Sequence, residues 1–234
     1  MTRLPSLYIT HGGGPCFWME FGPPFGPHAF DKLRAYLAGL IASLPERPKA
    51  ILVVSGHWEE SRPTVSTAAR PGMLFDYYGF PEHTYQLTYP AHNSPGIVTR
   101  IEELLSRAGY RAGEDDHRGL DHGVFVPFKL IYPDADVPMI QLSLLASLDA
   151  AAHIRLGKAL EPLRDEGVLI VGSGMSYHNL RAMYVQRQDV DNAVGEFDAW
   201  LTAAATDPDP ARRNTLLADW ENAPWARVCH PREE

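Results

Sequence analysis

Cysteine is nearly absent from this 234-residue chain, which contains only Cys16 and Cys229. Two cysteines are too few for the disulfide framework of a secreted protein of this length. The first five residues lead straight into an apolar run of only a few residues, which fits neither a signal peptide nor a membrane-spanning segment. We therefore expect a cytosolic protein.

Positive charge is also scarce. Lys and Arg number 21 against 29 Asp and Glu, so the formal net charge is −8, and no basic run occurs. This balance argues against a nucleic-acid partner and against an anionic membrane surface, because both require clustered Lys and Arg. Three standard motifs are missing as well, namely G-x-S-x-G, H-E-x-x-H and G-x-G-x-x-G. Their absence removes the common sequence signatures of serine hydrolases, zinc proteases and dinucleotide-binding proteins.

What the chain does contain is an alternation of helical and strand patterns. Helices are predicted over 30–44, 94–109, 151–164 and 192–205, and strands over 7–10, 50–55, 139–142 and 168–171. Such alternation is typical of an α/β fold with a mainly parallel central sheet flanked by helices. Residues 58–93 form a long aromatic and proline-rich loop, of a length that usually serves a function. No linker, charge block or repeat divides the chain, so residues 1–234 are predicted to form one domain.

Three histidines follow buried strand patterns at short distance. His11 follows the strand at 7–10, His57 the strand at 50–55, and His178 the strand at 168–171. In open α/β sheets, ligands bind in the crevice beyond the carboxyl ends of the strands. Imidazole is the commonest protein metal ligand and titrates near neutral pH. The pattern predicts a metal site with acid–base capability at the carboxyl edge of the sheet, although each histidine alone could equally be hydrogen-bonded at the rim.

Two further histidines stand out. His122 follows Asp121, which could fix the tautomer of that imidazole or simply cap the following helix. His230 lies in an otherwise charged tail and is harder to explain as a solvated residue. The remaining histidines are expected to be solvated rather than functional; they are His28, His83, His92, His117 and His153.

Taken together, several segments resemble the DOPA-dioxygenase-type branch of the class III extradiol ring-cleavage dioxygenases, the LigB-like superfamily. The matching segments run in the expected order over almost the whole chain. They are Thr10-His11-Gly12-Gly13-Gly14-Pro15, Ser55-Gly56-His57-Trp58, Tyr78-Gly79-Phe80-Pro81, Tyr89-Pro90-Ala91, Leu120-Asp121-His122-Gly123, Tyr132-Pro133-Asp134-Ala135-Asp136-Val137-Pro138, Gln141-Leu142-Ser143, and Gly172-Ser173-Gly174 through His178-Asn179-Leu180.

The resemblance implies that His11 and His57 are metal ligands. It places His178 beside the metal, as a further ligand or as the acid–base residue, and makes His122 a catalytic residue that faces substrate and oxygen. The implied activity is opening of the ring of a catechol-type, DOPA-like substrate with O₂. Fe(II) is the metal expected for catalysis, because open coordination positions let a catechol and O₂ bind together. Zn(II) is the alternative bound metal.

The tail departs from the family pattern. Related chains continue from a His-Pro-x-x-Glu stretch into a further metal-binding histidine, whereas this sequence ends at Glu234, one residue earlier. We therefore expect the sequence to lack a short C-terminal segment. A less favoured alternative is that Glu234 or His230 takes the place of the missing ligand.

Two other functions compete with ring opening. One is a zinc-dependent hydrolase, which is weakened because Glu59 is the only carboxylate that the sequence places near the strand ends. The other is a non-catalytic metal-binding or interaction protein of the Memo-like type on the same scaffold. The expected partners are a small aromatic diol and O₂, with no nucleic acid and no membrane, and a homo-oligomer is left open.

Overall fold

The computed structural model describes residues 2–23, 25–183 and 188–232. Within the chain, contacts define two compact units. The first comprises Met1–Ala146 and Ala159–Gly174, and the second comprises Ser147–Lys158 and Met175–Glu234. Each unit is described by itself below.

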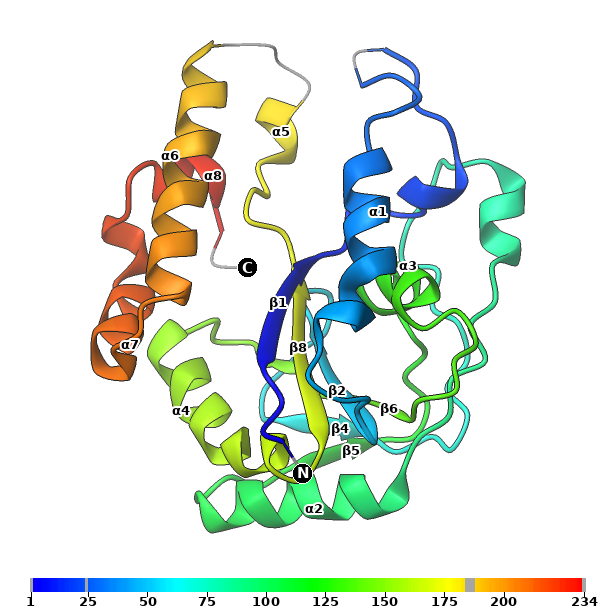
Figure 1. The fold of residues 1–234 in the computed structure, drawn as a ribbon, viewed down its shortest axis with the longest axis vertical. Coiled ribbons are helices and arrows are strands. Elements are labelled where there is room, and N and C mark those ends of the chain that lie inside the picture. The colour runs from blue at the N-terminus through cyan, green and yellow to red at the C-terminus, as the bar shows by residue number, and fades with distance from the viewer. Residues whose placement is uncertain (1, 24, 184–187, 233–234) are drawn as a thin grey trace. The chain divides into compact units, whose positions relative to one another are not determined.

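A four-stranded parallel sheet forms the centre of the first unit (Figure 1). Its strands follow the order β1 (Ser6–Thr10), β8 (Val168–Gly174), β2 (Ala50–Ser55) and β6 (Met139–Gln141). Thr10 pairs with Gly174, and Ser55 pairs with Ser173, so the carboxyl ends of these three strands lie level. The predicted α/β fold with a parallel central sheet is confirmed.

Apolar side chains of the sheet build the main core against two helices. Ile51, Val53, Leu169 and Val171 belong to one buried cluster with residues of α1 (Asp31–Gly39) and α3 (His122–Ile131), and these helices also pack on each other. Alternate residues of the strands, such as Leu52 and Val168, are buried as well. Continuous burial explains why the strands are uninterrupted apolar runs in the sequence. The predicted helix at 30–44 is α1 followed by a 3-10 turn at Leu40–Ser43.

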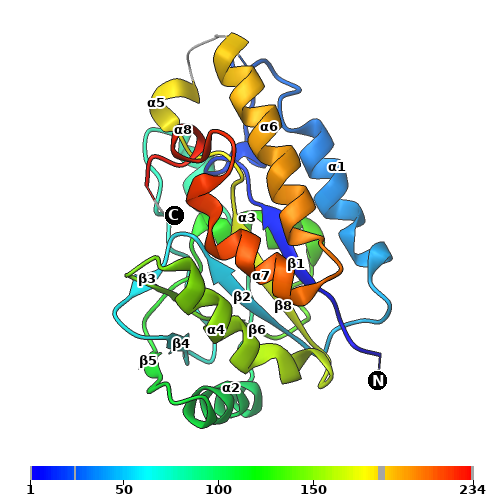
Figure 2. The same cartoon turned by 90° about the vertical axis from the view of Figure 1, so that its left-hand side faces the viewer.

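Helix α2 (Pro95–Arg107) lies beside a small parallel ladder of β4 (Thr64–Ser66) and β5 (Gly113–Asp115), as Figures 1 and 2 show. Gly109, at φ 84°, follows the end of this helix, within the predicted range 94–109. Ser94 holds the cap position, but its side chain makes no capping hydrogen bond.

The long 58–93 loop contains more regular structure than expected. It includes β4, a 3-10 turn η3 (Glu82–Gln86) and β3 (Glu59–Glu60), which pairs with β7 (Leu144–Leu145). A further short 3-10 turn, η1 (Cys16–Trp18), follows the glycine-rich segment after β1. These short elements hold the loop to the first unit and bring its aromatic stretch at 75–81 into contact with the main core.

The second unit is helical in its described part. It contains α4 (Ala150–Leu160) over most of its length, α5 (Leu180–Met183), α6 (Gln188–Ala205), α7 (Pro210–Ala218) and α8 (Ala226–Cys229). A 3-10 turn, η5 (Trp220–Asn222), follows α7, whereas the turn η4 (Glu161–Arg164) after α4 belongs to the first unit.

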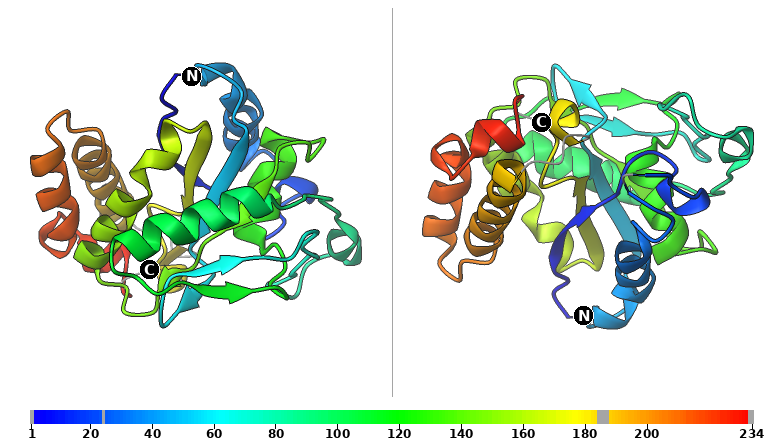
Figure 3. Two further views of the ribbon diagram at one scale, coloured as in Figure 1. Left: turned by 90° about the horizontal axis from the view of Figure 1, so that it is seen from below. Right: turned by 90° about the horizontal axis from the view of Figure 1, so that it is seen from above.

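Helix α6 packs against α7 and α8 (Figure 3), around Phe197, Ala223, Ala226 and Cys229. Helices α7 and α8 follow α6 and are additional to the predicted helices, which end with the one at 192–205. That residues 1–234 form one catalytic domain stays a prediction. Among the described residues, no helix has the length and apolar character needed to cross a membrane.

Candidate metal centre

His11 and His57 meet at the carboxyl edge of the sheet. His11 follows β1 directly, and its backbone N–H continues the ladder by donating to the carbonyl of Gly174. His57 lies two residues beyond β2. Their Nε2 atoms are 3.1 Å apart, and their ring centroids 4.9 Å. Two imidazole nitrogens that share a metal at ~2.0–2.1 Å are separated by a similar distance. Two of the three histidines predicted to converge here therefore lie together, and the place of His178 beside them stays a prediction.

His122 completes a cluster of three imidazoles. It is the first residue of α3, and its ring centroid lies 4.1 Å from that of His57 and 5.1 Å from that of His11. One ligand nitrogen from each of the three lies within 4.8 Å of the others. Only small side-chain shifts are needed for three nitrogens at ~2.1 Å from one ion. The chemistry of this donor set fits a transition metal such as iron or zinc.

Two serines that are register partners in the sheet hold this cluster. Ser173, on β8, donates to the carbonyl of Gly123, so its oxygen accepts the hydrogen bond of His11 Nδ1 at 3.1 Å. The proton of His11 therefore sits on Nδ1, and Nε2 carries the lone pair. Ser55, on β2, accepts from the backbone N–H of His57 at 3.2 Å and donates to Asp121 at 2.8 Å. Together the serines fasten the start of α3 to the strand ends.

The start of α3 fits tightly against these groups. A Cβ on Gly123 would lie 2.5 Å from Ser55 Oγ, 3.0 Å from His57 Cδ2 and 3.1 Å from an Asp121 oxygen. No side chain fits at residue 123 unless these neighbours move. This close approach explains the glycine that follows His122 in the sequence.

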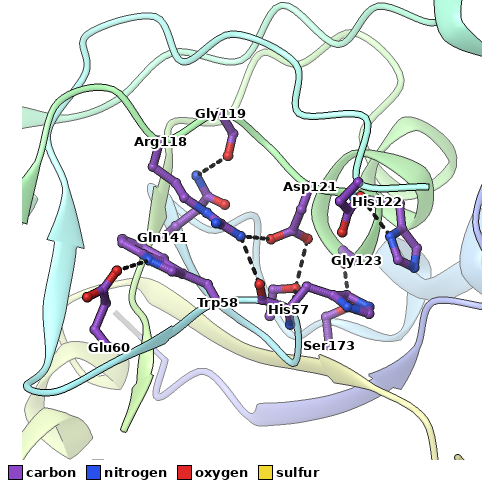
Figure 4. Close-up of polar contacts among 12 residues, drawn as sticks. His57, Trp58, Glu60, Arg118, Gly119, Asp121, His122, Gly123, Gln141 and Ser173 are labelled. Atoms are coloured by element: carbon purple, nitrogen blue, oxygen red, sulfur yellow. Dashed lines mark hydrogen bonds and ion pairs between the residues drawn. The ribbon is translucent and has the colours of Figure 1, made fainter. Parts of the chain in front are cut away.

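Asp121 has neither of the two roles considered for it. Its carboxylate, fully buried, accepts from Ser55 and forms a 2.7 Å ion pair with Arg118; its side chain makes no capping hydrogen bond to α3. Arg118 also donates to the carbonyl of His57 at 3.1 Å and lies over the ring of Trp58 (Figure 4). Asp121 and Arg118 thus support the backbone at His57, and the tautomer of His122 is set elsewhere.

The carboxylate that hydrogen-bonds to His122 belongs to Asp76, a residue that the sequence analysis missed. One Asp76 oxygen accepts from the His122 backbone N–H at 3.0 Å and lies 2.8 Å from its Nδ1. Burial raises the pKa of the Asp76 carboxyl, but the hydrogen bonds and charge of His122 lower it by more, so this pKa lies below its ordinary value. The only signal in the sequence was position, since Asp76 lies inside the aromatic stretch of the long loop.

Asp76 and Asp121 overturn the expectation that Glu59 is the only carboxylate close to the strand ends. Both carboxylates are occupied by hydrogen bonds, Asp76 with His122 and Asp121 with Arg118 and Ser55. These carboxylates hold neighbouring side chains in place. A hydrolytic base must instead take a proton from the attacking water. The zinc-hydrolase alternative gains nothing from them.

Glycines and aromatic rings surround the cluster. Gly12 and Gly14 adopt positive φ values of 77° and 52°, which glycine tolerates best. A Cβ on Gly14 would come within 3.0 Å of the ring of Phe80. The ring of Tyr77 lies edge-on to His122, with the centroids 6.1 Å apart. The aromatic stretch at 75–81 therefore packs around the segment that carries His11.

The other two candidate histidines belong to the second unit. The His178 backbone N–H donates to the carbonyl of Cys229 at 3.0 Å, and Asn179 donates to the carbonyl of Val228 at 2.8 Å. His230 contacts the carbonyl of Ser176 through Nε2 at 3.0 Å. Because a carbonyl only accepts, that nitrogen carries a proton and is unsuited to bind a metal. The role of His178 stays a prediction, and Glu234 lies outside the described residues.

The fold and the histidine cluster define an α/β protein with a candidate metal centre at the carboxyl edge of a parallel sheet. Residues 7–231 match the family described as the catalytic LigB subunit of aromatic ring-opening dioxygenase. The chain belongs to this family, which confirms the resemblance inferred from its motifs.

Individual relatives agree with the family. The chain is 40% identical over 230 residues to "Dioxygenase tasH" of Hapsidospora irregularis, with 95% of this chain and 65% of the relative covered. It is 41% identical over 191 residues to a "4,5-DOPA dioxygenase extradiol" of Beta vulgaris, with 80% and 71% covered. The chain thus spans about two thirds of the length of these curated relatives.

A solved structure has the same fold. The crystal structure of an uncharacterized protein from Escherichia coli K12 matches with a TM-score of 0.71 and 30% identity. The match covers 98% of this chain and 84% of that one.

Proposed function

We propose that this protein is an extradiol dioxygenase that opens the ring of a catechol-type, DOPA-like substrate with O₂. The observation that carries the proposal is the convergence of His11, His57 and His122 at the sheet edge in a chain of the LigB family. In such a reaction one carbon–carbon bond beside the diol breaks, and one oxygen atom of O₂ ends on each of its two carbons. No further oxidant or reductant is required.

His11 and His57 are proposed to hold the metal, Fe(II) for catalysis, with Zn(II) as the alternative occupant. Their 3.1 Å Nε2 separation and the Nδ1–H···Ser173 bond that presents the lone pair of His11 support this assignment. Bound Fe(II) would supply open positions for the two catechol oxygens and for O₂. His178 is proposed to stand beside the metal, as a further ligand or as the acid–base group.

His122 is proposed to act as an acid–base residue. A general base must take a proton from the catechol hydroxyl, and an imidazolium beside the reacting oxygens stabilises negative charge. The contact with Asp76 equips His122 for both tasks, because a carboxylate at Nδ1 stabilises the imidazolium formed when Nε2 accepts a proton. The clustering of all three rings also supports an alternative arrangement, in which His122 is itself a metal ligand.

The proposal is tested by anaerobic loading of the protein with Fe(II), followed by oxygen uptake over a panel of catechols that includes DOPA. Uptake of one O₂ per ring opened, with a yellow ring-opened product, is the expected result. Bound metal without uptake on any catechol would contradict the proposal and favour the non-catalytic, Memo-like alternative. Hydrolysis by a zinc-loaded form in the absence of O₂ would favour the hydrolase.

Single substitutions separate the roles of the histidines. His122→Ala is expected to retain the metal and to lower turnover by ~10²–10⁴-fold, which is typical for loss of a proton-transfer group. Loss of the metal in that variant would identify His122 as a ligand instead. The same comparison applied to His178→Ala distinguishes its two proposed roles.

The remaining assignments also belong to this proposal. A cytosolic location is proposed because Cys16 and Cys229 are both free and buried, in keeping with a reducing compartment. The substrate is a small aromatic diol, and neither nucleic acid nor a membrane is proposed as a partner.

A further inference from the structure

Asp76 makes two contacts with one residue of the candidate site. Its Oδ1 atom accepts from the backbone N–H of His122 at 3.0 Å, and the same atom lies 2.8 Å from the ring Nδ1. The two side chains are largely buried, with exposed fractions of 21% for Asp76 and 11% for His122. A single oxygen therefore fixes both the first residue of α3 and the direction of its ring.

We propose that Asp76 is a positioning residue that locks His122 in the tautomer with a proton on Nδ1 and a lone pair on Nε2. An ionised carboxylate has no hydrogen to donate, so a bond between Asp76 and Nδ1 requires the hydrogen to be on Nδ1. In a neutral imidazole the other nitrogen then carries the lone pair. Nε2 is the nitrogen that remains for the cluster with His11 and His57.

The lone pair on Nε2 is what either function of His122 needs. A general base accepts a proton through it, and a metal ligand coordinates through it. The opposite tautomer would present an N–H to the site and would serve neither function. Asp76 therefore matters whichever role His122 has, and only this consequence for turnover rests on the proposed function.

An exposed Asp–His pair elsewhere in the chain serves as a control for substitution of an aspartate beside a histidine. Asp116 and His117 are 3.3 Å apart, but their side chains are 72% and 92% exposed. Water competes for both groups there, so the carboxylate cannot impose a tautomer on His117. The two pairs differ in burial, in distance and in the ring nitrogen that faces the carboxylate, which is Nδ1 in His122 and Nε2 in His117.

The test is a ¹⁵N NMR measurement of histidine tautomers in the full chain without metal, with His122 assigned by the loss of its signals in His122→Gln. In the wild type we expect the neutral ring of His122 to carry its proton on Nδ1. Asp76→Ala should shift His122 to a mixture of tautomers or to the Nε2–H form. Asp76→Asn keeps an acceptor oxygen and should retain most of the Nδ1–H form, as a rescue. Asp116→Ala should leave His122 unchanged.

Activity provides the second readout. In the Fe(II)-loaded enzyme, Asp76→Ala is expected to lower kcat by about 10- to 100-fold, as is common for residues that orient a site histidine, with partial recovery in Asp76→Asn and little change in KM. An Nε2–H form of His122 in the wild type, or an unchanged tautomer in a folded Asp76→Ala, would overturn the proposal. Unchanged kcat in Asp76→Ala would overturn the positioning role. A wild type without ring opening would contradict the proposed function alone, since the tautomer is measured independently.

Discussion

Two regions of the chain carry candidate site histidines, and different groups hold them. At the sheet edge of the first unit, side chains do most of the holding, since Ser173 contacts the ring of His11 and Asp76 the ring of His122. In the second unit backbone carbonyls contact both candidate histidines, since the carbonyl of Cys229 accepts from the His178 N–H and that of Ser176 accepts from the ring of His230. A hydrogen bond from a side chain to an imidazole fixes which ring nitrogen faces the site. A hydrogen bond to the backbone N–H of a histidine fixes only the position of its main chain.

The side-chain supports of His11 and His122 indicate that the sheet edge is pre-organised. A metal site needs each imidazole in a defined tautomer and orientation before the ion arrives. The sheet edge has these supports in place, with each one contributed by a different segment of the chain. The loop of His178 has its position set by the segment at 226–230. Changes in the first region should therefore affect metal binding directly, and changes in the second should act more gently.

The largest effect is expected from His11→Ala or His57→Ala. Each change removes one of the two nitrogens that lie 3.1 Å apart, and the remaining cluster offers too few anchors to hold an ion. Metal binding, measured by anaerobic Fe(II) titration, should fall to an undetectable level, and turnover should drop by more than the ~10–100-fold typical for a supporting residue. His117→Ala, at an exposed histidine, is the control. Full metal binding by either site variant would remove that histidine from the ligand set.

A second prediction concerns the fit of α3 against the strand ends. Gly123→Ala should lower the free energy of unfolding by about 1–3 kcal/mol, because the added methyl group meets Ser55 Oγ at 2.5 Å in a packed region. Metal affinity should fall with it, since the methyl also presses on His57. Denaturant unfolding and Fe(II) titration measure the two effects. Gly96→Ala, in α2 with open space around it, should not destabilise the protein. Equal stability of both variants would contradict the fit described here.

A third, smaller effect is expected in the second unit. Asn179→Ala removes the hydrogen bond from its side chain to the carbonyl of Val228, worth about 0.5–1.5 kcal/mol at most. The backbone N–H of His178 should then exchange its hydrogen faster, as hydrogen–deuterium exchange would report. Metal binding at His11 and His57 should stay intact. A loss of metal as severe as in His57→Ala would erase the contrast between the two regions.

The smallest effect on stability is expected from a surface ion pair in the first unit. Arg100 forms several hydrogen bonds with Glu166, and these lower the pKa of the Glu166 carboxyl below its ordinary value of 4.5. A lowered folded-state pKa stabilises the fold above the ordinary pKa, and this contribution disappears as the pH falls through the folded-state pKa. Glu166→Gln should cost ~0.2–1 kcal/mol at neutral pH and nothing in strong acid. Urea unfolding at pH 7 and at pH 3 checks the sign; a cost that grows in acid would contradict it.

Much of the sheet edge was predictable because its pattern is local. An apolar run followed at once by histidine places that histidine at a strand end, and parallel strands bring their carboxyl ends to one edge. His11 and His57 met this condition, and their convergence follows. The helices at 94–109 and 151–164 were predictable for the same reason, from the spacing of apolar residues within one segment.

The supports of the site were not predictable, because they depend on pairings between distant segments. Ser55 and Ser173 are neighbours only because β8 lies between β1 and β2, an order that the sequence does not reveal. Asp76 comes from a loop without periodicity, so nothing local points it toward His122. The adjacent Asp121 was the obvious candidate to contact the ring of His122, yet its carboxylate binds Arg118 and Ser55 instead. Short-range patterns locate ligands, whereas their supports are set by tertiary structure.

The place of β8 in the sheet has a consequence for the order of assembly. Strands β1 and β2 are made early in synthesis, yet they do not pair with each other, and β8 at Val168–Gly174 joins them. A ribosome-bound chain that has not reached these residues has no neighbour for β1 in the sheet and no Ser173 for His11. Long-range parallel pairing of this kind forms late and slowly. The sheet edge that brings His11 and His57 together is therefore complete only after most of the chain has emerged.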